Sequence, residues 1–100
     1  MALTIVQTSE EAGKGYWDWE IHLEGSDDEL DRVKYVEYVL HETFPDPIRK
    51  ISDRSSGFQL ETSGWGTFRV YITIKLRTGS EIEESLNISF DRTREKSVVI

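Results

Sequence analysis

Cysteine is absent from this sequence of 100 residues. Its absence excludes disulfides, thiolate nucleophiles and zinc held by cysteine. Small secreted domains often need cross-links, so a chain with none is slightly more typical of a reducing compartment. No apolar run approaches the about 20 residues that span a bilayer, and segment 1–6 carries no basic residue. We therefore expect neither a membrane segment nor a secretory signal.

Catalytic motifs are absent as well. The two histidines, His22 and His41, are far apart in the sequence, and no G-x-S-x-G, P-loop or G-x-G-x-x-G motif is present. The acidic cluster at 27–31 lacks the alternating spacing and the glycine of a calcium loop. It is more typical of a solvated loop or of the start of a helical turn. We expect a protein that is not an enzyme and that uses no metal and no cofactor.

Basic residues are few. There are 12 Lys and Arg against 19 Asp and Glu, which gives a formal net charge of −7 and a sequence pI of about 4.8. Such a surface repels phosphate backbones, so direct nucleic-acid binding is disfavoured, whereas a basic peptide is attracted. The alternative is that the charge only maintains solubility.

Alternation of apolar and polar residues dominates the chain, and this period of two indicates half-buried strands. It is clearest over 16–24, 68–77 and 82–90, with shorter candidates at 3–8, 57–61 and 97–100. The predicted interior includes Trp19, Ile21, Val70, Ile72, Leu86 and Ile88. Seven or eight short strands in a chain of this length predict an all-β sandwich of two antiparallel sheets, formed by residues 1–100 as one domain.

Three connections have recognisable signals. Segment 78–81, Thr-Gly-Ser-Glu, predicts a hairpin turn with Gly79 at positive φ. Ser26 and Glu29 fit a capping box before a short helical turn that also takes in Leu30, Val33 and Tyr35, and a strand then runs from Val36 to about His41. Two prolines make 42–47 a loop. Glu84 interrupts an otherwise apolar row, which places it at a rim.

Three segments together resemble the YEATS domain family. They are 17–25 (WDWEIHLEG), 39–49 (VLHETFPDPIR) and 58–68 (FQLETSGWGTF). Their order and spacing are similar to the family's His-x-Trp strand, its Leu-His-x-Ser/Thr-Phe-x-x-Pro loop and its Ser-Gly-Trp/Tyr-Gly-x-Phe turn. The resemblance implies an immunoglobulin-like β-sandwich that reads acylated lysine of the acetyl or crotonyl type. The compact size and the acidic surface look more like the prokaryotic branch, which implies a cytoplasmic protein; a eukaryotic member would be nuclear.

The same resemblance implies a site in which an acylated lysine enters an aromatic slot. Phe44 and Trp65 would form its walls, the Thr43 hydroxyl would accept from the ligand N–H, and the Trp65 backbone N–H would donate to the acyl oxygen. Glycine on either side of Trp65 would let the backbone approach, and His41 would brace the hydroxyl or the loop. The candidate acyl-lysine-binding residues are His41, Thr43, Phe44, Gly64, Trp65 and Gly66.

Simpler interpretations remain open for these residues. Phe44 also fits a plug at the end of the sandwich, and His41 fits a residue that organises its own loop. The alternative function is a protein–protein interaction scaffold with a vestigial pocket. We expect a monomer whose partner is a protein or peptide carrying acylated lysine, with no membrane partner. If the slot exists, loop 41–47 and turn 63–67 meet at one end, with the Phe44 and Trp65 rings about 4–7 Å apart or flanking a shared groove.

Overall fold

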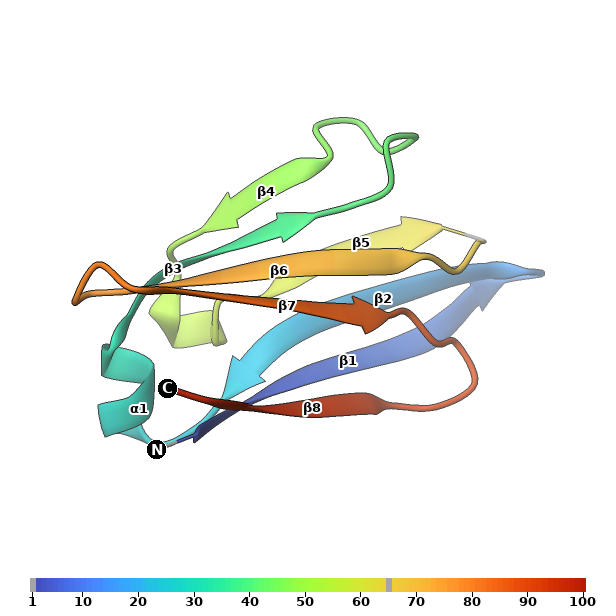
Figure 1. Ribbon diagram of the computed structural model, residues 1–100. Coiled ribbons are helices and arrows are strands. Elements are labelled where there is room, and N and C mark those ends of the chain that lie inside the picture. The colour runs from blue at the N-terminus through green and yellow to red at the C-terminus, as the bar shows by residue number, and fades with distance from the viewer. Residues whose placement is uncertain (1, 65) are drawn as a thin grey trace.

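The computed structural model describes residues 2–64 and 66–100, which form two four-stranded antiparallel sheets packed face to face (Figure 1). The prediction of an all-β sandwich is confirmed. The first sheet has the order β5-β2-β1-β8 and the second β4-β3-β6-β7. In chain order the strands are β1 (Ala2–Gly13), β2 (Tyr16–Glu24), β3 (Val33–Val39), β4 (Ile48–Ile51), β5 (Leu60–Gly64), β6 (Arg69–Leu76), β7 (Glu81–Asn87) and β8 (Arg94–Val99).

The core lies between the sheets and is built from the alternating apolar residues. All six residues predicted inside are buried; their exposed fractions are Trp19 3%, Ile21 0%, Val70 0%, Ile72 1%, Leu86 8% and Ile88 4%. Each such side chain stabilises the fold by about 1.5–3 kcal/mol through removal of apolar surface from water. The period of two therefore gave the correct faces for β2, β6 and β7.

The segment before β3 contains the predicted capping box. The Ser26 hydroxyl accepts from the Glu29 N–H at 3.2 Å, and the Glu29 carboxylate accepts from the Ser26 N–H at 2.8 Å. This pair starts α1 (Asp27–Asp31), and the hydrogen bonds also lower the pKa of Glu29. The prediction that Val33 and Tyr35 continue the helical turn is wrong, because both pair with β6 as part of β3.

Other segments also differ from their predicted bounds, and two of the differences have a clear physical reason. Segment 57–61 is not extended from its start: Gly57 ends the 3-10 turn η1 (Arg54–Ser56), and Gly57 and Phe58 have φ of 72° and 56°. Two consecutive left-handed residues cannot lie in a strand, so β5 begins only at Leu60. The edge strand β4 has no clean alternation and was not predicted; it pairs with β3 from Val39↔Ile48 to Val36↔Ile51.

Glu84 interrupts the apolar row of β7 because it lies at the open side of the sandwich, between β7 and β8. Glu84 points between the sheets at their rim and forms an ion pair with Lys96 Nζ at 2.8 Å. Lys96 also donates to the Ser85 carbonyl of β7 at 3.2 Å. Gly79 has φ of 99° in the hairpin that precedes β7, as predicted.

Gln7 is a fully buried polar residue that fixes the loop after β7. Its amide accepts from the Ser89 N–H at 3.0 Å and donates to the Ser89 carbonyl at 3.0 Å and the Thr8 carbonyl at 3.1 Å. Buried amides are tolerated when both their donors and acceptors are paired. This network therefore ties β1 to the start of the connection between β7 and β8.

Tyr38 is a second buried polar side chain, and it leads to a testable prediction. Its hydroxyl donates to the Phe58 carbonyl at 2.7 Å, and burial raises its pKa well above the ordinary value. Tyr38→Phe is expected to lower the free energy of unfolding by about 1–2 kcal/mol near neutral pH, because the Phe58 carbonyl loses its partner.

The same substitution tests the pKa. Above about pH 10 the unfolded tyrosine ionises while the folded Tyr38 stays protonated, so the wild type loses stability as the pH rises, by up to about 1.4 kcal/mol per pH unit. The stability gap between wild type and Tyr38→Phe should therefore narrow from pH 9 to pH 11 in urea unfolding. A constant gap would contradict the raised pKa.

Candidate functional site

The loop between β3 and β4 and the turn between β5 and β6 meet at one end of the sandwich, as predicted. Between them lies a cavity of about 280 Å³, here called the loop groove. It is lined by His41, Thr43, Phe44, Gly64, Gly66, Thr67 and Phe68. Five of the six candidate residues line it. The sixth, Trp65, lies outside the described residues, so the distance between its ring and Phe44 stays a prediction.

Hydrogen bonds from both ends hold the loop that carries His41. The Leu40 N–H donates to the Pro47 carbonyl at 2.7 Å, and the Phe44 N–H donates to the His41 carbonyl at 3.0 Å. The Arg49 side chain reaches back from β4 and donates to the carbonyls of Asp46 and Pro45 at 2.6 and 2.9 Å. The loop is therefore shaped before any ligand arrives.

His41 and Thr43 form a pair whose donor and acceptor roles follow from geometry. The backbone N–H of Thr43 can only donate, and it lies 3.3 Å from His41 Nδ1. With Nδ1 accepting from this N–H, the Thr43 hydroxyl, 2.9 Å from the same atom, also donates to it and shares its lone pair. The hydroxyl lone pairs remain available to accept a hydrogen bond. This supports the predicted bracing role of His41.

Phe44 packs on the end of the core and lines the loop groove at the same time. Its ring centroid lies 5.2 Å from that of Phe68 and 6.4 Å from that of Trp19, the latter edge-to-face. The side chain is half-buried. The interpretation as a plug is therefore correct as far as packing goes, and it does not exclude a role as a groove wall.

The two glycines differ in their surroundings. A Cβ on Gly64 would lie 3.7 Å from Phe44 Cζ, in ordinary contact, so the absence of a side chain keeps this part of the groove open. A Cβ on Gly66 would meet no described atom within 4 Å. Gly64 does not have positive φ. The expectation that glycine is needed here is thus explained at Gly64 by the space that its missing side chain leaves in the groove.

Sequence reasoning missed two residues of the loop groove, Thr67 and Phe68. Phe68 was placed in the turn motif and in the apolar row of the following strand but not among the candidate site residues, yet its ring contacts Phe44 and lies 6.2 Å from the His41 ring. The glycine-x-Phe ending of the turn motif was the available signal.

The residues that the structure describes around the loop groove include no Asp or Glu and no Lys or Arg. Among the described residues, no group of three or more His, Cys, Asp or Glu side chains is placed to hold a metal ion. A neutral amide with an apolar tail suits such a lining, whereas an ammonium would lose its hydration without a charged partner. No helix in the described part of the chain is long and apolar enough to span a membrane.

Two four-stranded antiparallel sheets, with a groove between loops at one end, form an immunoglobulin-like β-sandwich. The sequence model of the prokaryotic YEATS domain matches residues 17–89 of the chain. The chain belongs to this family.

Solved structures show the same fold. The Yaf9 YEATS domain bound to H3K27ac has a TM-score of 0.81 at 19% identity, over 97% of this chain and 81% of that one. The Yaf9 YEATS domain recognising an H3K122suc peptide has the same TM-score and identity, over 97% of this chain and 80% of that one.

Curated relatives match over shorter segments. The protein AF-9 homolog of Candida albicans is 34% identical over 50 residues, which cover 50% of this chain and 19% of that protein. The protein AF-9 homolog of Kluyveromyces lactis is 43% identical over 42 residues, which cover 42% of this chain and 18% of that protein. The matches thus span about a fifth of the length of these relatives.

Proposed function

We propose that residues 1–100 act as one non-enzymatic binding module that reads an acylated lysine on a protein or peptide. The observation that carries the proposal is the loop groove of about 280 Å³. Its described lining has two phenylalanine rings and no carboxylate or lysine, and no described residue donates to the Thr43 hydroxyl when that hydroxyl donates to His41. This volume lies near the lower end for ligand sites, which suits one side chain.

The chemistry of the ligand matches this lining. An acylated lysine ends in a flat, neutral amide with an apolar tail, and aromatic walls stabilise such a group by dispersion and by loss of apolar exposure. Its N–H needs an acceptor, which the Thr43 hydroxyl supplies while it donates to His41. Its acyl oxygen needs a donor, and we assign this role to the backbone N–H of Trp65 on the strength of the family motif.

The relatives support the proposal without identifying the partner. Two of the solved Yaf9 domains are bound to acylated histone H3 peptides. For a chain of the prokaryotic family we propose a cytoplasmic partner protein or peptide, bound through acetyl-type or crotonyl-type lysine, with no direct contact to nucleic acid or membrane and with the domain acting as a monomer.

A protein–protein interaction scaffold is the second candidate function, and one feature favours it. Ile48 and Tyr71 are 61% and 57% exposed on the outer face of the second sheet. Both pair with Val39 in register, so the three residues form an apolar row across β4, β3 and β6 beside the loop groove. Exposed apolar rows of this kind often mark partner contacts.

Titration with acylated and unmodified lysine peptides of one sequence tests the proposal. Wild type is expected to bind the acylated peptide in the micromolar to millimolar range, about −4 to −8 kcal/mol. Thr43→Val keeps the shape but leaves the ligand N–H unpaired, and is expected to weaken binding by about 1–3 kcal/mol. Thr43→Ser, which keeps the hydroxyl, is the matched control and should bind nearly as well as wild type.

Two salt concentrations separate groove binding from attraction to the acidic surface, because only the latter weakens strongly with salt. Equal binding of acylated and unmodified peptides at both salt concentrations would contradict the proposal that the domain reads acylated lysine, and would favour the function as an interaction scaffold. So would equal affinities of Thr43→Val and Thr43→Ser.

A further inference from the structure

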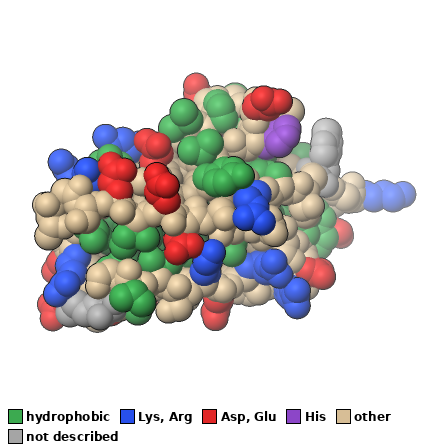
Figure 2. All heavy atoms as spheres, in the orientation of Figure 1, with side chains coloured by type: hydrophobic (Ala, Val, Ile, Leu, Met, Phe, Trp, Pro, Cys, Tyr) green, Lys and Arg blue, Asp and Glu red, His purple; other side chains and the backbone are tan. Residues whose placement is uncertain are grey.

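A second groove, here called the basic groove, follows the edges of β7 and β8 on the open side of the sandwich. Its volume is about 500 Å³. Figure 2 shows Lys and Arg side chains gathered over these two strands. The lining residues are Arg69, Ser85, Leu86, Asn87, Arg92, Thr93, Arg94, Glu95 and Lys96, four of them cationic and one acidic. In a chain with an excess of acids this is an unusual concentration of positive charge.

Arg94 is the residue in this groove that most needs an explanation. It is half-buried and pairs in register with the fully buried Gln7, in the same row as Lys96 and Val98. No hydrogen bond or ion pair joins its side chain to any other described residue. Its methylene stem can account for the buried part of the residue, and its guanidinium is left with donors that an anionic or hydrogen-bonding partner would satisfy. The exposed Arg92 is equally without such a bond within the described ranges.

The other two cations are already engaged. Lys96 is held by Glu84 at 2.8 Å and by the Ser85 carbonyl at 3.2 Å. Arg69 donates to the Ser85 hydroxyl at 2.9 Å. The Ser89 hydroxyl donates a hydrogen bond to the Asp91 carboxylate. This bond is the main reason that the pKa of Asp91 is lowered, and the charges of Arg92 and Arg94 contribute less. Arg92 and Arg94 therefore keep their donors for a group from outside.

We propose that the basic groove binds an extended acidic segment of a partner protein. Arg guanidinium groups bind carboxylates through paired hydrogen bonds, so charge complementarity selects an acidic ligand. Among the described strands, β8 is the last of its sheet, so an extended peptide can pair with its free edge. A polynucleotide has no such backbone and would be repelled by the net charge of −7. The basic groove shares no residue with the loop groove, so this site is independent of acyl-lysine binding.

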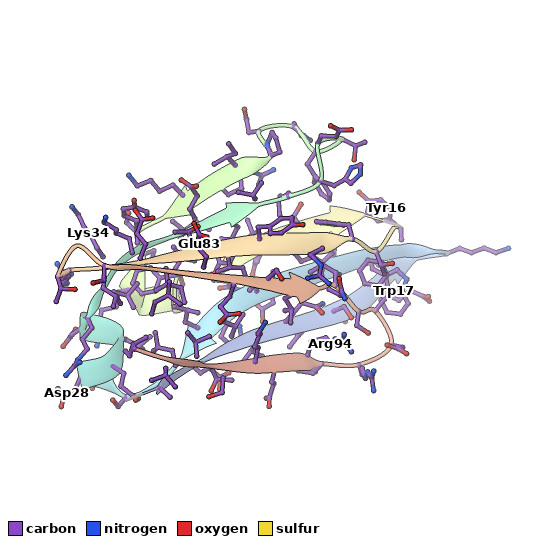
Figure 3. The ribbon with its side chains drawn as sticks, viewed as in Figure 1. Tyr16, Trp17, Asp28, Lys34, Glu83 and Arg94 are labelled. Carbon is purple, nitrogen blue, oxygen red and sulfur yellow. The ribbon has the colours of Figure 1, made fainter. Side chains whose placement is uncertain are left out.

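The test uses a labelled peptide of alternating Glu and Thr, about eight residues long so that it covers β8. We compare Arg92→Gln/Arg94→Gln with Arg32→Gln/Lys34→Gln, a control that removes the same charge near α1, where Lys34 lies far from Arg94 (Figure 3). Wild type is expected to bind, the first variant about 10-fold or more weaker, and the control within about 2-fold of wild type. Thr43→Val should leave this affinity unchanged.

Several results would overturn the proposal. They are no binding of the peptide to wild type, an equal loss in both double variants, or a loss in Thr43→Val, which would place the peptide in the loop groove. Tighter arginine-dependent binding of an oligothymidylate than of the peptide would assign the basic groove to nucleic acid. N-methylation of alternate peptide residues should weaken binding, because it removes the N–H donors; no change would reject the pairing with β8.

Discussion

Gly57→Ala is expected to lower the free energy of unfolding by about 2–5 kcal/mol. Gly57 has φ of 72°, a conformation that costs a residue with a side chain about 1–2 kcal/mol. The added Cβ would also lie 2.6 Å from the Leu23 carbonyl oxygen. That oxygen belongs to the backbone of β2, and the Leu23 N–H donates to the Gly57 carbonyl at 2.8 Å. Neither partner can move away without breaking this bond.

Substitutions at two other glycines distinguish the cost of the positive φ from the cost of the contact between the added Cβ and β2. Gly79 has φ of 99° but open space around its Cβ position, so Gly79→Ala should cost only the strain, about 1–2 kcal/mol. Gly13 has open space and no positive φ, and Gly13→Ala should stay within about 0.5 kcal/mol of wild type. Urea unfolding of the three variants gives the comparison. Equal losses at Gly57 and Gly79 would show that β2 yields to the new methyl group.

Gly64→Leu is expected to abolish detectable acyl-lysine binding, a loss of about 100-fold or more, which corresponds to about 2.8 kcal/mol. The Cβ position of Gly64 faces Phe44 Cζ at 3.7 Å across the loop groove. A branched side chain built from that position would fill the space that the acyl group needs. Gly64 lies at the end of β5 with ordinary φ, so the fold should survive.

Gly64→Ala is the matched control, because its methyl group only reaches van der Waals contact with Phe44. It should retain most of the binding, and thermal unfolding should show both variants folded. Trp65→Ala has the opposite effect on the groove, because it removes a proposed wall instead of filling the space. This variant too should abolish binding while it leaves the fold intact. If Gly64→Leu binds like Gly64→Ala, the ligand does not enter the loop groove.

The fold was largely predictable because alternation reports directly on burial. β2, β6 and β7 each have one face toward the core and the other toward solvent. Apolar and polar residues must therefore alternate along them with a period of two. β4 lacks this signal, since Ile48 is exposed and Ile51 only half-buried at the sheet edge. The left-handed φ of Phe58 could not be foreseen either, because its carbonyl is held by Tyr38 from a distant strand.

The candidate site was predictable in its residues and less so in its arrangement. The resemblance of the two loop segments to the YEATS family indicated His41, Thr43, Phe44, Gly64 and Gly66, and the structure brings these five residues together around one groove. Phe68 was missed because a residue in an alternating apolar row is explained by the core alone. The arginines of the basic groove gave no signal at all, since only the packing of β8 beside β7 brings Arg94 and Arg69 to one surface.

The clamp that Arg49 forms on the carbonyls of Pro45 and Asp46 has a kinetic consequence. A loop that is already held in shape requires no slow rearrangement before the ligand enters, so association should be fast and similar for different acyl groups. Differences in affinity between acyl groups would then arise mainly from how long each one stays bound. Selectivity of this domain is therefore expected to be a matter of residence time rather than of encounter rate.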